Sequence, residues 1–196
     1  MDQSIYLELE EEIITLLRKK LPPELTYHEP EHTLDVISAA ERLAKMEGLD
    51  PNDLLLVKTA ALFHDTGYLF ERRDHEQKSC SIAREYLSAN QIPPAEIETI
   101  CQMIMATKVP QQPANRLEEI LCDADLDYLG RDDFNTISEK VFEEFRKFGV
   151  VHDREEWKKL QVKFFETHRY FTGSAIQLRR QKKEDNLSAI RSAIQV

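Results

Sequence analysis

The stretch LLLVKTAALFHD, residues 54–65, decides the fold. Lys58 and Thr59 are the only polar side chains among its first ten residues, so a helix here is apolar on almost every side. A helix of that kind lies buried at the centre of a domain. The stretch ends in His64 and Asp65. We therefore expect two ionisable side chains at the end of a core helix.

Glycine is scarce in the whole chain, with 5 residues in 196. Strand-rich folds and dinucleotide-binding folds use glycine in tight turns and phosphate loops, and neither GxGxxG nor a Walker A sequence is present. Hydrophobic residues make up 41% of the chain and charged residues 32%, which is typical of a globular protein. The composition predicts helices joined by short links.

Apolar residues recur with a period of 3.6 along most of the chain. Asp50 and Pro51 are typical of the start of a helix, and Pro22 and Pro23 of the end of one. The predicted helices cover about 3–20, 30–47, 51–64, 75–89, 94–106, 116–129, 132–147, 153–171 and 174–194.

Charge and cysteine content narrow the function classes. The formal net charge of −10 argues against nonspecific nucleic-acid binding. The sequence contains no run of 18 apolar residues, so it predicts no membrane span. The acidic start MDQSIYLELEEE is not typical of a signal peptide. The three cysteines lack CxxC spacing, which disfavours a disulfide framework or a thiolate zinc site. We expect a cytoplasmic protein that does not bind membranes.

Two further ionisable side chains interrupt apolar helix faces. His32 falls within the apolar arc of residues 30–47, and Asp125 falls between Leu121 and Leu129 on the 116–129 helix. Buried imidazoles and carboxylates are costly unless they are paired or bound to metal. Two histidines and two aspartates, counting His64 and Asp65, can supply four ligands to a divalent ion.

Residues 28–32, HEPEH, match the HExxH pattern of zinc proteases. That pattern needs both histidines on one face of a helix. Pro30 is tolerated only in the first helical turn, which leaves His28 outside the helix. We therefore disfavour a protease, and Glu29→Gln tests that hypothesis: unchanged peptidase activity, or none in the wild type, would exclude it.

The ordered set His32, His64-Asp65 and Asp125 resembles the H…HD…D pattern of the HD-domain metal-dependent phosphohydrolase superfamily. The stretches 74–76 (DHE) and 121–130 (LCDADLDYLG) strengthen the resemblance, which covers about residues 27–130. It implies an all-α fold, a helical bundle of about eight or nine helices. We expect a single HD-like domain over 1–196, with a motif core at 27–130 and a C-terminal helical pair at about 150–196.

The resemblance also implies roles for individual residues. The metal ligands would be His32, His64, Asp65 and Asp125. The leaving oxygen would be protonated by His28, as in the distantly related cyclic-nucleotide phosphodiesterases, or by His75. Substrate phosphate would be met by Arg72, Arg73 and Lys108. Asp123 would either orient a ligand histidine or remain a solvated acid.

Dinuclear members of the family that this chain resembles use extra histidines between the HD doublet and the final aspartate, where this chain has only His75. The resemblance therefore implies one divalent ion per chain, and Mg, Mn, Fe, Ni and Zn are not distinguished. The implied reaction is hydrolysis of a phosphoester of a nucleotide or other small molecule by a metal-activated water. A homodimer is compatible with the sequence. The alternative is a noncatalytic regulatory module that binds metal or nucleotide, in which the basic run 179–183 would matter for binding. Otherwise we expect that run to be a solvated helix face.

Overall fold

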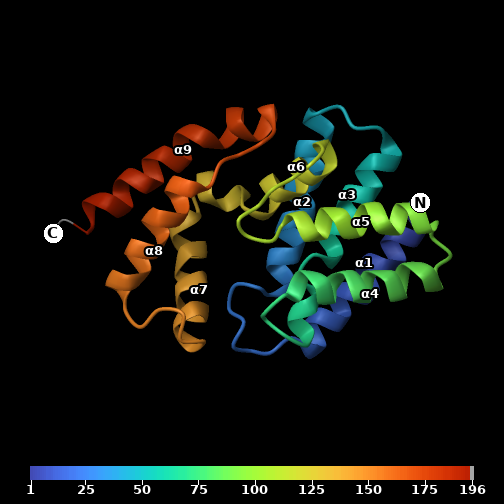
Figure 1. The fold of residues 1–196 in the computed structure, drawn as a ribbon, viewed down its shortest axis with the longest axis horizontal. Helices are drawn as coiled ribbons and strands as arrows, with labels where there is room; N and C mark the ends of the chain where they lie inside the picture. The colour runs from blue at the N-terminus through green and yellow to red at the C-terminus, as the bar shows by residue number, and fades with distance from the viewer. Residues whose placement is uncertain (195–196) are drawn as a thin grey trace.

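The computed structural model describes residues 1–194, which form nine α-helices, two short 3-10 helices and no strand (Figure 1). The α-helices are α1 (Gln3–Lys20), α2 (Pro30–Met46), α3 (Pro51–Phe63), α4 (His75–Ala89), α5 (Pro94–Ala106), α6 (Arg116–Asp125), α7 (Phe134–Lys147), α8 (Arg154–Thr167) and α9 (Gly173–Ser192). The 3-10 helices are η1 (Thr66–Leu69) and η2 (Asp127–Gly130). The predicted all-α bundle of eight or nine helices is confirmed.

Helix α3 is the central element of the first six helices. It packs against α1, α2, α5 and α6, and most of its residues belong to the main hydrophobic core. The Asp50 carboxylate accepts hydrogen bonds from the backbone N–H groups of Asn52 and Asp53, and Pro51 occupies the first turn. Because α3 is buried, the groups at its end are held in fixed positions.

Helix α2 begins at Pro30, and Glu29 before it is extended, with φ −102° and ψ 167°. His28 therefore lies outside the helix while His32 is buried on it. This confirms that the two histidines of HEPEH do not share a helical face.

Two predicted helices end earlier than expected. The predicted helix 116–129 stops at Asp125 and continues as η2, and the predicted helix 153–171 stops at Thr167. The backbone N–H groups of Phe171 and Thr172 donate instead to the Asp123 carboxylate, at 2.9 and 2.8 Å. Thr172 then caps α9. Contacts between distant segments thus override the local helical pattern.

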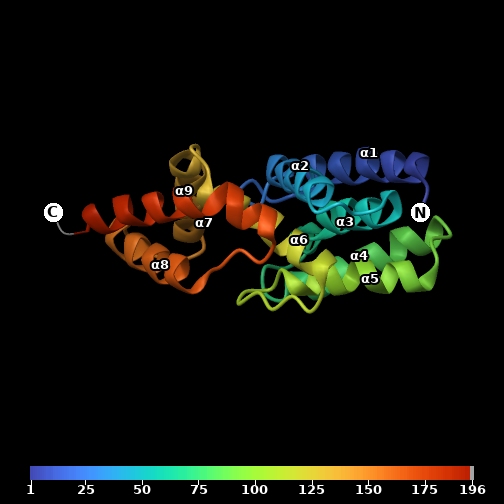
Figure 2. The same cartoon turned by 90° about the horizontal axis from the view of Figure 1, so that it is seen from above.

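Helices α7, α8 and α9 lie to one side of α1 to α5 in both views (Figures 1 and 2), and α6 packs against α2, α3 and α5. Helix α9 packs along η2 and α8. At this crossing a Cβ on Gly130 would overlap the backbone of Arg179, so only glycine allows the close approach. Gly130, the last residue of η2, therefore allows α9 to pack closely against η2.

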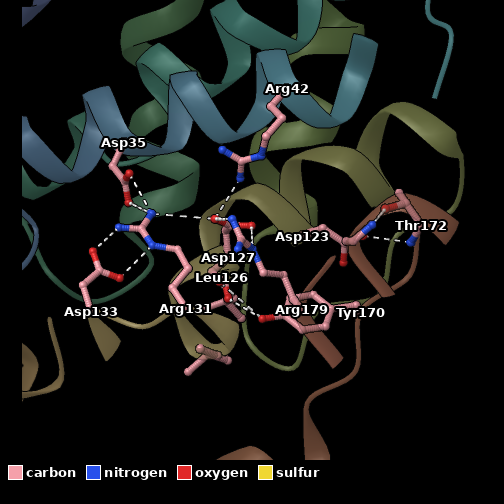
Figure 3. Close-up of polar contacts among 12 residues, drawn as sticks. Asp35, Arg42, Asp123, Leu126, Asp127, Arg131, Asp133, Tyr170, Thr172 and Arg179 are labelled. Carbon is pink, nitrogen blue, oxygen red and sulfur yellow. Dashed lines mark hydrogen bonds and ion pairs between the residues drawn. The ribbon is translucent and has the colours of Figure 1, made fainter. Parts of the chain in front are cut away.

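The contact between α9 and η2 contains a buried charge cluster (Figure 3). Asp127 is 1% exposed and accepts hydrogen bonds from Arg42 at 2.9 Å and from Arg179 at 2.7 and 3.0 Å. A third arginine, Arg131, lies 3.7 Å from the same carboxylate. Lys183 donates to the carbonyl oxygen of His168. The prediction that 179–183 is a solvated face is therefore wrong for Arg179 and Lys183.

Cys80, Cys101 and Cys122 are free thiols, as the spacing predicted. None of the helices between residues 1 and 194 has the length and apolarity that crossing a membrane requires.

Candidate metal centre

The end of α3 fixes the His64-Asp65 doublet. His64 is the residue directly after the helix, and its Nδ1 donates to the carbonyl oxygen of Ala61 at 2.8 Å. This bond leaves the lone pair of a neutral imidazole on Nε2, the nitrogen that faces the site. A hydrogen bond to the far nitrogen is how proteins orient a histidine that binds metal.

Side chains from α2, the end of α3 and the end of α6 converge on His64 Nε2. His32 Nε2 lies 3.4 Å away, Asp65 Oδ2 3.2 Å and Asp125 Oδ1 3.6 Å. His32 Nε2 is also 3.5 Å from Asp65 Oδ2 and 3.4 Å from Asp125 Oδ1. One ligand atom from each of His32, His64 and Asp125 fits within a distance of 4.8 Å. The four residues predicted as ligands are thus brought together.

The charges of this cluster favour the binding of a cation. Burial alone would lower the pKa of His64, but Asp65 and Asp125 raise it well above its ordinary value. Burial would raise the pKa of Asp125, but His32 and His64 lower it to about 2. Asp65 Oδ2 is buried and has no hydrogen-bond donor. An acceptor without a donor, beside two imidazole nitrogens and a second carboxylate, fits a divalent ion.

His75 is the first residue of α4 and lies beside the cluster. Its Nδ1 donates to the carbonyl oxygen of Arg72 at 3.1 Å, and its Nε2 is 3.3 Å from Asp65 Oδ1. A Cβ on Gly67 would overlap the His75 carbonyl, so glycine is required where the backbone after the HD doublet meets α4. Burial lowers the pKa of His75, but its contact with Asp65 outweighs this and raises it.

His28 forms a second polar group with a residue that the sequence analysis missed. Its Nδ1 contacts the Glu144 carboxylate of α7, and its Nε2 lies 3.2 Å from the Tyr68 hydroxyl. Glu144 is fully buried and also accepts the backbone N–H groups of Tyr27 and His28, at 2.9 and 3.1 Å. Burial would raise the pKa of Glu144, but these contacts lower it. A carboxylate held ionised in this way fixes the His28 ring.

The Tyr68 ring stands between the two candidate acids. It stacks on His28 and on His75, with 4.2 Å between ring centroids in each case. Neither Tyr68 nor Glu144 was singled out from the sequence. Glu144 could have been noticed in the sequence as a charged residue on an apolar helix face, because it lies three residues after Val141 on the buried face of α7. No comparable feature marks Tyr68.

The three predicted phosphate-binding residues border the same cleft, a cavity of about 540 Å³ that also contains His28, Asp65, His75 and Asp125. The Arg72 guanidinium lies over the Phe148 ring, 3.9 Å from its centroid, and its Nε is buried without a partner. The Arg73 side chain is 96% exposed. Lys108 Nζ pairs with Asp74 at 2.5 Å. Arg72 is therefore held most firmly at the cleft.

Asp123 has neither of the roles expected for it. It is fully buried, so it is not a solvated acid, and its oxygens accept hydrogen bonds from Phe171 and Thr172 rather than from a ligand histidine. The Thr172 hydroxyl also donates to it, at 2.7 Å. Burial raises the pKa of Asp123 to about 6, against the effect of these hydrogen bonds. Asp123 joins α6 to the segment before α9.

The family model described as "HD domain" matches residues 31–127. A "predicted HD superfamily hydrolase" from an uncultured Thermotogales bacterium is 23% identical over 94% of this chain and 88% of its own, with a TM-score of 0.60. Lin1889 from Listeria innocua is 17% identical over 98% and 95%, with a TM-score of 0.68. Bacillus subtilis YpgQ, solved in complex with ADP, is 20% identical over 96% and 95%, with a TM-score of 0.64. These structures share the fold. No curated protein sequence matches the chain.

Proposed function

Because this chain belongs to the HD-domain family, we propose that it is a metal-dependent phosphohydrolase that hydrolyses a phosphoester of a nucleotide or another small molecule. One observation carries the proposal: the cluster of four predicted ligands borders, through Asp65 and Asp125, a cleft that also holds His28 and His75. An isolated metal site without proton donors would instead favour a regulatory module.

The four converging residues would hold one divalent ion. The ion would supply a Lewis acid that lowers the pKa of water and polarises a phosphoryl oxygen. The hydrogen bond from His64 Nδ1 to Ala61 presents Nε2 toward the ion. Asp65 has a further task, because its Oδ1 faces His75 while its Oδ2 faces the ligand histidines.

His28 is our candidate for the acid that protonates the leaving oxygen. Glu144 holds its Nδ1 in place, while Nε2 faces Tyr68 and the cleft. His75, whose pKa is raised, is the second candidate. Loss of the fixing carboxylate in Glu144→Gln should therefore lower kcat, because the His28 ring is no longer held toward the cleft, while KM changes little.

The cationic side chains at the cleft would offset the charge of the phosphate. Arg72 is the strongest candidate because its guanidinium is already positioned by Phe148. Arg73 and Lys108 reach the same cleft from more exposed positions. A nucleotide is a suitable substrate class, since the similar YpgQ structure contains ADP. Three free cysteines suit a reducing compartment, and we assign the activity to the cytoplasm.

The test is phosphate release by metal-free protein supplied with Mn²⁺, Mg²⁺, Co²⁺, Ni²⁺ or Zn²⁺ across a panel of nucleotides and other phosphoesters. We expect release that depends on metal, that is lost in His64→Ala, and that is unchanged in His152→Ala, a matched change of an exposed histidine. Metal binding without turnover on any substrate would support the regulatory module instead. Equal rates for His64→Ala and wild type would overturn the site.

A further inference from the structure

The cleft continues beyond the candidate metal centre into a chamber with apolar walls. The walls come from η2, α7 and α8, which in Figure 1 form the side of the molecule away from α1 to α5. We call this part the aromatic chamber, and define it by Tyr128, Phe134, Phe145, Trp157, Leu160 and Phe164. The chamber and the catalytic groups line one continuous cavity, so a single ligand can reach both.

Several chamber side chains are incompletely covered by the protein itself. Tyr128, Phe145 and Phe164 are only partly buried, although they pack on the hydrophobic clusters of the C-terminal helices. Water against such surface is unfavourable by roughly 25 cal/mol per Å². A ligand that covers these rings would recover that free energy.

The geometry of the rings favours a flat ligand. Tyr128 and Phe134 lie nearly parallel, with an interplanar angle of 11° and 6.2 Å between centroids. Phe145 meets Trp157 edge to face at 5.7 Å. These contacts hold the wall in place, and the partly buried Tyr128, Phe145 and Phe164 keep uncovered surface that a planar ring can contact, since aromatic rings prefer offset-stacked and edge-to-face partners.

Polar recognition at this end of the cavity is sparse. Gln161 also lines the cavity, and its Nε2 already donates to the Ser138 hydroxyl at 2.7 Å. The chamber therefore offers stacking in place of a set of hydrogen bonds to a ring edge. Stacking is tolerant of ring identity, because every aromatic ring has a π-face.

The two ends of the cavity come from different parts of the chain. The ionisable residues of the cavity from Asp65 to Asp125 lie within the matched range 31–127. The chamber begins at Tyr128 and is built from the elements after that range. The helices outside the family match thus supply the apolar wall of the cavity.

We infer that the aromatic chamber binds a planar ring system on the organic part of the phosphoester, so that the substrates are nucleoside or aryl phosphates in preference to sugar or polyol phosphates. This inference rests on the proposed function, because it places the phosphate among Arg72, His75 and the metal ligands. The cavity of about 540 Å³ is a usual size for a small-molecule site. Trp157, the single tryptophan of the chain, reports directly on occupancy.

The test compares AMP with ribose 5-phosphate, which carries a hydroxyl group in place of the adenine ring. Metal-free protein is titrated with each while Trp157 fluorescence and binding heat are followed. We expect AMP to bind about tenfold more tightly and to change the emission, since the ring adds stacking contacts. Equal affinities, or no AMP binding at millimolar concentration, would overturn the inference.

Variants assign the preference to the chamber. Phe164→Ala should weaken AMP binding about fivefold or more and leave ribose 5-phosphate unaffected, and Phe164→Leu, which keeps volume but not the ring, should lose most of the same preference. The matched control is Phe70→Ala, because Phe70 is 68% exposed and lies outside the cavity. An undiminished preference in both Phe164 variants would refute the assignment.

The experiments distinguish an error in the proposed ring preference from an error in the proposed reaction. If the protein is a phosphohydrolase without this specificity, metal-dependent phosphate release proceeds with equal kcat/KM on AMP and ribose 5-phosphate. If the chamber is right but the proposed reaction is wrong, AMP binds with the ring preference and no phosphate is released with any metal.

Discussion

Asp125 and Asp127 are two residues apart, and both lie in clusters of buried charge, but they are neutralised in opposite ways. Asp127 is surrounded by Arg42, Arg131 and Arg179, cations that the chain supplies permanently (Figure 3). Asp125 is surrounded by His32 and His64, which carry charge only when protonated.

The difference indicates a structural role for Asp127 and a role in metal binding for Asp125. The arginine cluster is complete within the chain and joins α2, η2 and α9. The histidine cluster leaves Asp65 Oδ2 without a donor and opens onto the cleft, so its missing charge must come from an exchangeable proton or metal ion. We expect changes at Asp127 to cost stability and changes at Asp125 to cost metal binding.

The largest expected effect is on activity. Asp125→Asn removes one carboxylate ligand, so metal affinity should fall by more than about 100-fold and activity should fall with it, because even partners behind the ligands are worth up to that factor. The measurement is phosphate release against metal concentration, with the exposed Asp132→Asn as control. Full activity at the wild-type metal concentration would place the metal elsewhere.

Next in size is the loss of stability from the arginine cluster. Asp127→Asn leaves three guanidinium groups beside a neutral amide, and breaking a buried ion pair costs about 3–5 kcal/mol of unfolding free energy. Urea denaturation measures this loss. If the variant were as stable as wild type, hydration of the arginines would compensate for the lost contacts with Asp127. The proposed contrast between a structural Asp127 and a metal-binding Asp125 would then be wrong.

A smaller loss is expected where α9 crosses η2. Gly130→Ala places a Cβ against the backbone of Arg179, and forcing atoms into a packed contact costs about 1–3 kcal/mol. Gly173→Ala is the matched control, because nothing lies closer than 4.0 Å to its new Cβ. The two variants should differ in urea midpoint, and equal midpoints would show that the crossing is loose.

The pH dependence sharpens the contrast through His64. Burial opposes its charge, but Asp65 and Asp125 raise its pKa well above 6.5. In metal-free protein this contribution to stability is present below the ordinary pKa and is lost as pH rises through the folded-state pKa. Metal needs the neutral ring, so affinity should increase with pH by about tenfold per unit for each proton released. Calorimetry in buffers of different ionisation enthalpy measures the number of protons released. If no proton were released, metal binding would not deprotonate His64.

The sequence predicted most helix starts because caps are local. Asp50 and Pro51 start α3 as expected, and α4 and α5 have the predicted bounds. The end of α8 could not be predicted, because residues 171–172 donate hydrogen bonds to Asp123 on a distant helix.

The site was predictable to the extent that polar residues interrupt apolar faces. His32 and Asp125 stand out on their helices, and the structure brings them beside His64 and Asp65. The arginine cluster left no comparable signal, because Arg42 and Arg179 are 85 and 52 residues from Asp127 in sequence. Glu144 was detectable on its helix face, but its pairing with His28 across 116 residues was not.

The central claim is that the histidine cluster needs an exchangeable cation and the arginine cluster does not. Thermal unfolding of wild type, Asp125→Asn and Asp127→Asn, each with and without Mn²⁺, tests it directly. A bound ion stabilises only a fold that holds it. We predict that Mn²⁺ raises the Tm of wild type and Asp127→Asn by the same increment and leaves Asp125→Asn unchanged. An equal increment in Asp125→Asn, or its loss in Asp127→Asn, would contradict the account.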